Sequence, residues 1–186
     1  MKNRSEIPLD EKIRILARVL HDVVERNIIT YASPLKLSVN QFLILKILFI
    51  SNSQNVSDIA EVLNISRAAA SKNIDFLVRK RLVSRKIVSK DRRAMCVSLR
   101  DAGEKIIQTY NEISQKKIKS ILLNFNSDEQ KLLSQFLDKY IIHSLDLEQN
   151  IRLICMQCGG KYEGQCYIGD HREGCYFKLQ DSSDSS

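Results

Sequence analysis

The segment Ser66–Arg93, SRAAASKNIDFLVRKRLVSRKIVSKDRR, concentrates the positive charge of this chain. It contains ten Lys or Arg and two acidic residues, a net charge of +8, whereas the whole chain of 186 residues carries +7. The rest of the chain is therefore close to neutral. A basic segment in an otherwise neutral protein is typical of a surface that binds a polyanion, and nucleic acid is the first candidate.

The basic segment begins inside a predicted helix-turn-helix. A short helix is expected to start at the N-cap Ser57 and to end at Leu63, and Asn64 then breaks the chain. Ser66 caps a longer helix that extends to about Lys80. A short helix, a tight turn and a longer helix form the outline of a helix-turn-helix.

After this helix the hydrophobic period changes from that of a helix to that of a strand. Val83–Val88 and Met95–Leu99 are predicted to form a two-stranded wing. The tip between them, Ser89–Arg93, is polar and mostly basic. The polar stretch Ser51–Asn55, upstream of the helix-turn-helix, is interpreted as a break between helices.

Amphipathic or apolar helices are predicted on both sides of this unit. They are one from about Asp10 to Thr30, one opened by a capping box of Ser38 and Gln41, one beginning near Ala102, and one opened by a capping box of Ser127 and Gln130. The second is apolar around most of its axis and should be central and buried. The predicted fold is mainly α with a small β wing.

Four short motifs occur in an order and at spacings that resemble the winged-helix core of MarR-type transcriptional regulators. They are Ile65-Ser66-Arg67, Arg81-Leu82-Val83, Asp91-Arg92-Arg93 and Ala102-Gly103. The resemblance covers roughly residues 10–150. It implies a homodimer, built by the first and last helices, that binds a pseudo-palindromic DNA operator. Arg81 departs from the family, which usually has a glycine there to end the helix in a left-handed turn.

The expected DNA contacts follow from helix geometry. If Ala70, Ile74 and Leu77 pack inward, the opposite face and the start of the helix meet the DNA, and small residues there allow a close approach to the bases. The predicted contacts are Ser66, Arg67, Ala68, Ala69, Ser71, Lys72, Arg85, Asp91, Arg92 and Arg93. The alternative is that these charges form only a solvated surface.

The wing tip is predicted to read the shape of the minor groove. A guanidinium fits a narrow A·T-rich groove, where the negative potential is enhanced. The resemblance implies that either Arg92 or Arg93 enters the groove and that Asp91 pairs with the other. A plain charged hairpin turn is the alternative.

A second pattern lies near the C-terminus, where Cys155, Cys158, Cys166 and Cys175 fall within 21 residues that also hold five of the six glycines. A segment with so few apolar side chains has no core of its own, so a metal with four cysteine ligands would organise it. Only Cys155 and Cys158 are closely paired, which favours a [4Fe-4S] cluster over a zinc ion with its two close pairs. Zinc, free thiols and disulfides remain the alternatives.

The predicted organisation has five parts. They are an N-terminal dimerisation helix (1–36), a winged helix-turn-helix DNA-binding domain (37–100), C-terminal dimerisation helices (101–150), a four-cysteine metal-binding segment (151–180) and a disordered tail (181–186).

The function expected is that of a cytoplasmic, dimeric transcriptional regulator whose metal centre senses redox state or oxygen. We expect no enzymatic activity, because no catalytic set of carboxylates, Ser/His/Asp or phosphate-binding glycines is found. No membrane contact is expected either, and a small-molecule effector is left open as a further partner. Two other functions remain: a regulator with a structural zinc clip, and an iron-sulfur redox protein that carries a winged helix.

Overall fold

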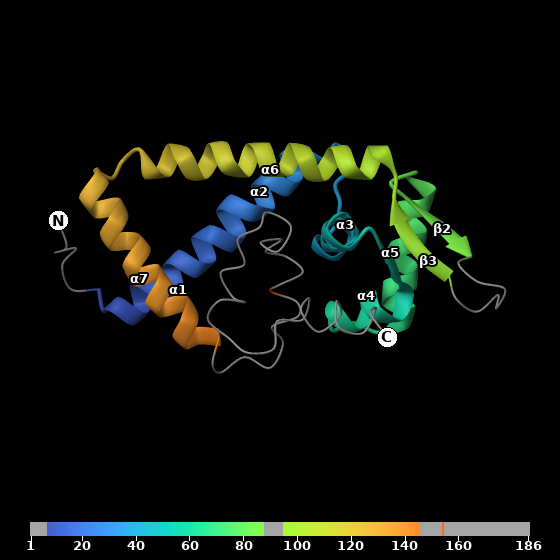
Figure 1. Ribbon diagram of the computed structural model, residues 1–186, viewed down its shortest axis with the longest axis horizontal. Coiled ribbons are helices and arrows are strands. Elements are labelled where there is room, and N and C mark those ends of the chain that lie inside the picture. Colours follow the sequence, from blue (N-terminus) through green and yellow to red (C-terminus); the bar gives the residue numbers. More distant parts are fainter. Residues whose placement is uncertain (1–6, 88–94, 146–153, 155–186) are drawn as a thin grey trace, which may run out of the picture.

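The computed structural model describes residues 7–87, 95–145 and 154, and in it the chain is mainly helical with a small three-stranded antiparallel sheet (Figure 1). The helical elements are α1 (Leu9–Arg18), η2 (Val19–Glu25), α2 (Arg26–Ala32), α3 (Val39–Ser51), α4 (Val56–Val62), α5 (Arg67–Arg79), α6 (Asp101–Leu122) and α7 (Ser127–Leu145). The strands are β1 (Ser53–Asn55), β2 (Val83–Ile87) and β3 (Met95–Leu99). This confirms the predicted fold class. We call α3, α4, α5 and the sheet the winged-helix unit.

Helix α3 is the centre of the hydrophobic core. Its predicted capping box is confirmed, because Ser38 Oγ accepts the Gln41 N–H and Gln41 Oε1 accepts the Ser38 N–H. Six of its side chains are buried: Phe42, Ile44, Leu45, Ile47, Leu48 and Ile50. They lie all around the axis, because other helices and the sheet pack on α3 from several sides. The expected central position is confirmed.

The helix-turn-helix is formed by α4 and α5, with one correction at its start. The N-cap of α4 is Asn55 and not Ser57, since Asn55 Oδ1 accepts the Asp58 N–H at 2.9 Å. Both residue types make good caps, and the pairing of β1 fixes the extended backbone of Asn55 just before the helix. The expected cap of α5 is confirmed, because Ser66 Oγ accepts the Ala69 N–H at 3.1 Å.

The sheet has three strands in the order β1-β3-β2, so the expectation of two strands was wrong. Ser53–Asn55 pairs with Cys96–Ser98 of β3. This short polar strand has no hydrophobic alternation of its own, and it is extended because β3 offers a free edge to pair with. The strands β2 and β3 have the predicted pairing, with Val83 opposite Leu99 and Ile87 opposite Met95. The predicted tip lies outside the described residues.

Helix α5 ends in the left-handed turn that its sequence put in doubt. Arg81 has a φ of 59°. The Arg81 N–H bonds to Val78 O, and the Leu82 N–H bonds to Leu77 O, both at 2.9 Å. This is the Schellman pattern that normally uses glycine. Arginine therefore adopts the same turn, at a cost of roughly 1 kcal/mol for its Cβ.

Gly103, in the first turn of α6, lies directly against the turn that follows α5. A Cβ placed on Gly103 would be 2.3 Å from the Leu82 carbonyl oxygen and 2.8 Å from Leu99 Cδ2. The same Leu82 oxygen accepts the Arg100 N–H at 3.0 Å, so it is fixed in place. Only glycine allows α6 to start this close to the winged-helix unit.

The turn between α6 and α7 corrects another predicted cap. Asn126 and Glu129 form the capping box of α7, one residue before the predicted Ser127 and Gln130. Asn126 Oδ1 accepts the Glu129 N–H at 3.0 Å, and Glu129 Oε2 accepts the Asn126 N–H at 2.8 Å. Gln130 Nε2 instead donates to the carbonyl of Leu122, the last residue of α6, and to that of Phe125 in the turn that follows.

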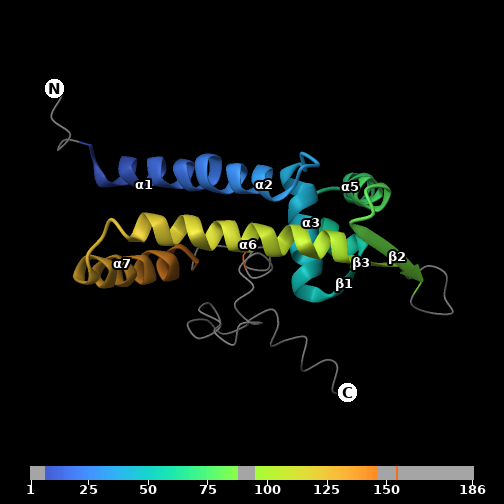
Figure 2. The same ribbon diagram turned by 90° about the horizontal axis from the view of Figure 1, so that it is seen from above.

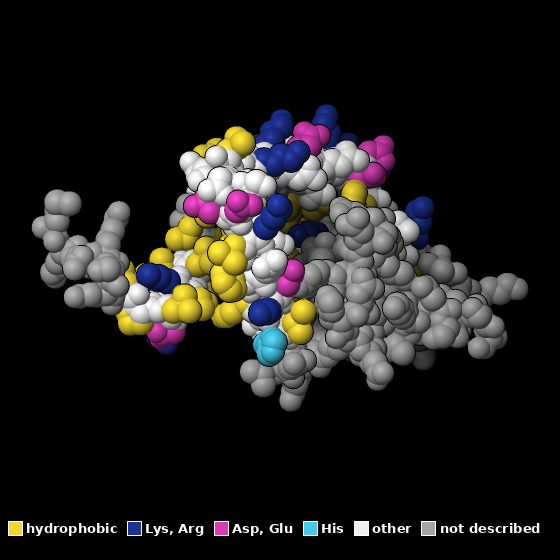
Figure 3. Space-filling model, turned by 60° about the vertical axis from the view of Figure 1, so that its left-hand side comes forward, with side chains coloured by type: hydrophobic (Ala, Val, Ile, Leu, Met, Phe, Trp, Pro, Cys, Tyr) yellow, Lys and Arg dark blue, Asp and Glu magenta, His cyan; other side chains and the backbone are white. Residues whose placement is uncertain are grey.

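The first helix runs from Leu9 to Ala32 and is interrupted by the π-helical turn η2, in which the Arg26 N–H bonds to His21 O. Its last part packs beside α6 (Figure 2). At the end of the molecule away from the sheet, helices α1, η2, α6 and α7 carry exposed apolar side chains (Figure 3). We call this the apolar end face: Ile15, Leu16, Val19, Leu20, Ile118, Ile121, Leu132, Phe136, Leu137, Tyr140 and Ile141. Within the described ranges, no helix has both the length and the apolar character needed to cross a bilayer.

Candidate nucleic-acid interface

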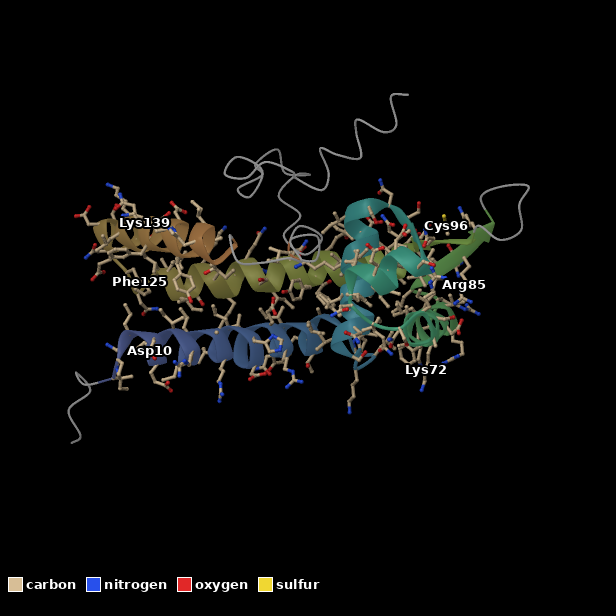
Figure 4. All side chains as sticks on the ribbon, turned by 90° about the horizontal axis from the view of Figure 1, so that it is seen from below. Asp10, Lys72, Arg85, Cys96, Phe125 and Lys139 are labelled. Atoms are coloured by element: carbon tan, nitrogen blue, oxygen red, sulfur yellow. The ribbon has the colours of Figure 1, made fainter. Side chains whose placement is uncertain are left out.

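Helix α5 has one buried face and one exposed, cationic face. Ala70, Ile74 and Leu77 are fully buried, as predicted. Arg67 and Lys72 are exposed. Figure 4 shows Lys72 on the side of α5 away from the strands, pointing out of the molecule. The helix therefore presents positive charge to any ligand that approaches from outside.

A ligand can approach the backbone at the start of α5 closely. Ser66 and Ala68 are exposed and Ala69 is half-buried, so little side-chain volume covers this turn. Ser66 Oγ accepts the Ala69 N–H, and its own hydroxyl proton remains available to donate. The partial positive charge of the helix N-terminus adds to that of Arg67, which suits a phosphate oxygen.

Asn73 joins α5 to α3, a contact that sequence reasoning missed. Asn73 Oδ1 accepts from Gln41 Nε2 at 3.4 Å, and Asn73 Nδ2 donates to Ala69 O at 3.0 Å. Gln41 thereby serves both the cap of α3 and the middle of α5. The two residues are 32 positions apart, and no local pattern indicates that they meet.

Arg85 lies between the sheet and α5, and not on the exposed face (Figure 4). Its Nη2 is 2.8 Å from Asp75 Oδ1 and donates to Ser71 Oγ at 3.4 Å. The side chain of Arg85 is 26% exposed and that of Asp75 is 44% exposed. Two predicted contact residues, Ser71 and Arg85, are thus brought into contact with each other.

The other predicted site residues lie outside the described part of the chain. These are Asp91, Arg92 and Arg93 of the wing tip, and Cys155, Cys158, Cys166 and Cys175. Within residues 7–87, 95–145 and 154, no group of three or more His, Cys, Asp or Glu side chains could hold a metal. Cys96 is a half-buried free thiol on β3, between Asn55 and Lys86 of the neighbouring strands.

Aromatic and charged side chains from the first helix, α3 and α6 meet in one cluster. Tyr110 packs against Phe42 with ring centroids 4.6 Å apart, and Lys46 Nζ lies 5.4 Å from the Tyr110 centroid. Burial, followed by the negative charge of Glu25, raises the pKa of Tyr110 to about 12, while a hydrogen bond with Ser114 acts in the opposite direction. Tyr110 therefore stays neutral at physiological pH.

Comparison with known proteins places these features in context. The profile of the MarR family matches residues 37–95. The HTH-type transcriptional regulator YpoP of Bacillus subtilis is 32% identical over 112 residues, which are 60% of this chain and 77% of YpoP.

Solved structures share the fold. The reduced form of MarR from E. coli has a TM-score of 0.56 at 25% identity, covering 72% of this chain and 96% of that one. A point mutant of MepR from S. aureus, bound to an oligodeoxyribonucleotide, has a TM-score of 0.60 at 18% identity, covering 73% of this chain and 97% of that one.

Proposed function

This chain belongs to the MarR family of winged-helix transcriptional regulators, and from this premise we propose that it binds double-stranded DNA as a dimer, with α5 in the major groove of each half-site. The observation that carries the proposal is the exposed cationic face of α5. Lys72 lies on that face and Arg67 is exposed in the first turn of the helix, while Ala70, Ile74 and Leu77 anchor the opposite face in the core. The oligonucleotide bound to the MepR mutant supports the same ligand class.

The second copy in the dimer is supported by the apolar end face. Large side chains such as Phe136 (60% exposed) and Leu132 (51% exposed) would stay in water in a single chain. An apolar patch spread over several helices is typical of a surface that another protein covers. Two copies joined there would carry two recognition helices, one α5 in each copy. This suits a pseudo-palindromic DNA operator with half-sites about one helical turn apart.

Substitution of the exposed face tests the DNA-binding proposal. Arg67→Ala and Lys72→Ala are each expected to weaken DNA binding by about 1–3 kcal/mol. Each loss of a phosphate contact should also lower the slope of log affinity against log salt by about one, because fewer counterions are released. The measurement is fluorescence anisotropy at several salt concentrations, with a duplex that the parent protein selects from a random pool.

Lys139→Ala is the matched control, because Lys139 is an exposed lysine on the outer side of α7, at the other end of the molecule from Lys72 (Figure 4). It removes the same charge far from α5, so it should leave the salt slope unchanged. Parent-like binding by both α5 variants, or a flat salt dependence of the parent, would argue against DNA recognition by α5.

The wing is proposed to read the minor groove through Arg92 or Arg93. The strands β2 and β3 pair as far as Ile87 and Met95, and the intervening residues include the basic Asp91-Arg92-Arg93 motif. A guanidinium in a narrow A·T-rich groove would add shape recognition to the base contacts made by α5.

For the C-terminal segment we propose a cysteine-ligated metal centre, a [4Fe-4S] cluster with zinc as the alternative. The support is the donor set alone: Cys155, Cys158, Cys166 and Cys175 are four thiolates, which is the number that either centre needs. The segment follows α7 in the sequence, so a change at the centre could reach the proposed dimer contact and alter the spacing of the two copies of α5.

Loss of the centre is expected to change operator affinity by about 1–3 kcal/mol, the usual size of an allosteric coupling. The comparison uses anaerobic protein, air-exposed protein and a Cys155→Ser/Cys158→Ser variant at one salt concentration. Iron, sulfide and zinc analysis with visible absorption identifies the centre independently of DNA binding. Cys96→Ser, in the wing strand, is the control. Equal affinities in all three forms would leave the segment without a regulatory role.

A small-molecule effector stays a prediction. The hollow that Phe42, Lys46 and Tyr110 share with His21 and Glu25 measures about 20 Å³, which is close to the space of one water molecule. An effector at this junction would have to separate the first helix from α3, and that movement would alter the position of the winged-helix unit relative to the dimer helices.

A further inference from the structure

Arg85 is held by two groups of the recognition helix. Its Nη2 contacts Asp75 Oδ1 at 2.8 Å and Ser71 Oγ at 3.4 Å. Ser71 and Asp75 are four residues apart on α5, so they lie on neighbouring turns of one helix face. A single guanidinium nitrogen from strand β2 therefore joins the stem of the wing to the middle of α5.

The strand pattern explains why Arg85 points toward α5. Alternate residues of a strand face opposite sides, so Arg85 shares the face of Val83, which is only 1% exposed. Its partner on β3 is Val97, which is fully buried. Lys86 lies on the other face and is exposed. Two adjacent cations of β2 thus differ: one is turned inward against α5, and the other faces solvent.

Arg85 and Asp75 neutralise each other's charge. Asp75 is the one acidic residue of α5, and an unpaired carboxylate there would repel the DNA backbone that α5 is proposed to approach. Arg85 neutralises it. In turn, a guanidinium bound to a carboxylate and a hydroxyl is not free to replace counterions on a phosphate.

The contact contributes little to stability, because a partly exposed ion pair usually adds less than about 1 kcal/mol. Arg85 Nε, moreover, is buried without a hydrogen-bond partner in the described part of the chain. The guanidinium is therefore oriented by Asp75 and Ser71, and not by the need to satisfy all of its donors. The contact therefore matters for the position of β2 relative to α5 more than for stability.

We propose that Arg85 is a positioning residue that sets the angle between the wing and the recognition helix, and not a direct DNA contact. By donating to Ser71 Oγ, Arg85 occupies a lone pair of that hydroxyl and leaves its proton free to point toward DNA. This inference rests on the proposed DNA-binding function, and it gives Arg85 a different role from that of Arg67 and Lys72.

The test is a double-mutant cycle in DNA affinity, with the same selected duplex. Arg85→Ala is expected to lower affinity about tenfold while keeping the salt slope of the parent. Lys72→Ala, by contrast, lowers the slope by about one. Asp75→Ala should lower affinity by a similar factor in the parent but change it little in the Arg85→Ala background, because the link between β2 and α5 is already broken there. Independent contacts would give the same factor for Asp75→Ala in both backgrounds.

Lys86→Ala is the matched control, since it removes the same charge from the adjacent, outward position and breaks no contact with α5. All variants should melt within about 4 °C of the parent, as expected for a partly exposed ion pair. Arg85→Gln, which keeps much of the packed stem, replaces Arg85→Ala if the alanine variant does not fold.

Two results would overturn the inference alone: a salt slope lowered by about one in the Arg85 variant, or equal effects of Asp75→Ala in the two backgrounds. A parent protein that selects no duplex would instead overturn the proposed function, and this inference with it.

Discussion

Replacing Phe136 by glutamate is expected to leave the protein monomeric and to lower its affinity for a duplex with two half-sites by roughly 10²–10⁴-fold. Phe136 is the most exposed aromatic side chain of α7 and lies among Leu132, Leu137 and Tyr140 on the apolar end face. A carboxylate placed there would lose its hydration in a dimer without gaining a partner. A monomer keeps one recognition helix and loses the gain from binding two half-sites at once.

Analytical ultracentrifugation gives the oligomeric state, and circular dichroism shows whether the variant is folded. Gln135→Glu is the control: it adds the same charge at the adjacent exposed position, which is polar in the parent protein. If the Phe136 variant does not fold, the melting temperature of the parent should rise with protein concentration, as it does for coupled folding and association. A dimeric Phe136→Glu protein, or a parent that is monomeric at high concentration, would contradict this interface.

Gly103→Ala is expected to lower the free energy of unfolding by about 3 kcal/mol, at the upper end of the usual cost of overpacking. Helix propensity alone predicts the opposite sign, because alanine is favoured over glycine in a helix by about 1 kcal/mol. The new methyl group would lie 2.3 Å from the Leu82 carbonyl oxygen. That oxygen belongs to the turn closing α5, so it cannot move without displacing the recognition helix or the wing.

Urea denaturation at a fixed protein concentration measures this loss. Ala102→Gly is the complementary control, since Ala102 is exposed and the exchange there should cost at most about 1 kcal/mol. A Gly103→Ala protein as stable as the parent would mean that α6 can move away from Leu82 at little cost. Reduced DNA affinity at full stability would instead indicate that the strain is relieved by a shift of the winged-helix unit.

The sequence predicted the parts of the fold that depend on local signals. The capping box of Ser38 and Gln41, the cap at Ser66 and the buried face of α5 were all correct, because each is set by residues within one or two turns. The errors came where neighbours compete or where distant partners decide. Asn126 took the capping role assigned to Ser127, and β1 exists only because β3 pairs with it.

The candidate site was predictable by composition and less so by arrangement. Charge identified the segment, helix periodicity placed Lys72 on the exposed face, and Arg67 was expected at the start of the helix. Periodicity could not show that Arg85 turns toward Asp75, because this depends on how β2 packs against α5 in three dimensions. The same holds for Asn73 and Gln41, whose contact spans 32 residues.

The π-helical turn η2 changes the rotation between the two halves of the first helix. In an α-helix each residue advances the side chains by a constant angle, so apolar residues at regular spacing form one continuous stripe. Extra residues in a turn reset that phase. Before η2, Ile15 and Leu16 face the proposed second copy, and after it, Ile28 and Ile29 lie in the core beside α6. One residue added or removed in this turn would rotate the proposed dimer contact relative to the winged-helix unit. That rotation would change the distance between the half-sites that the dimer can bind.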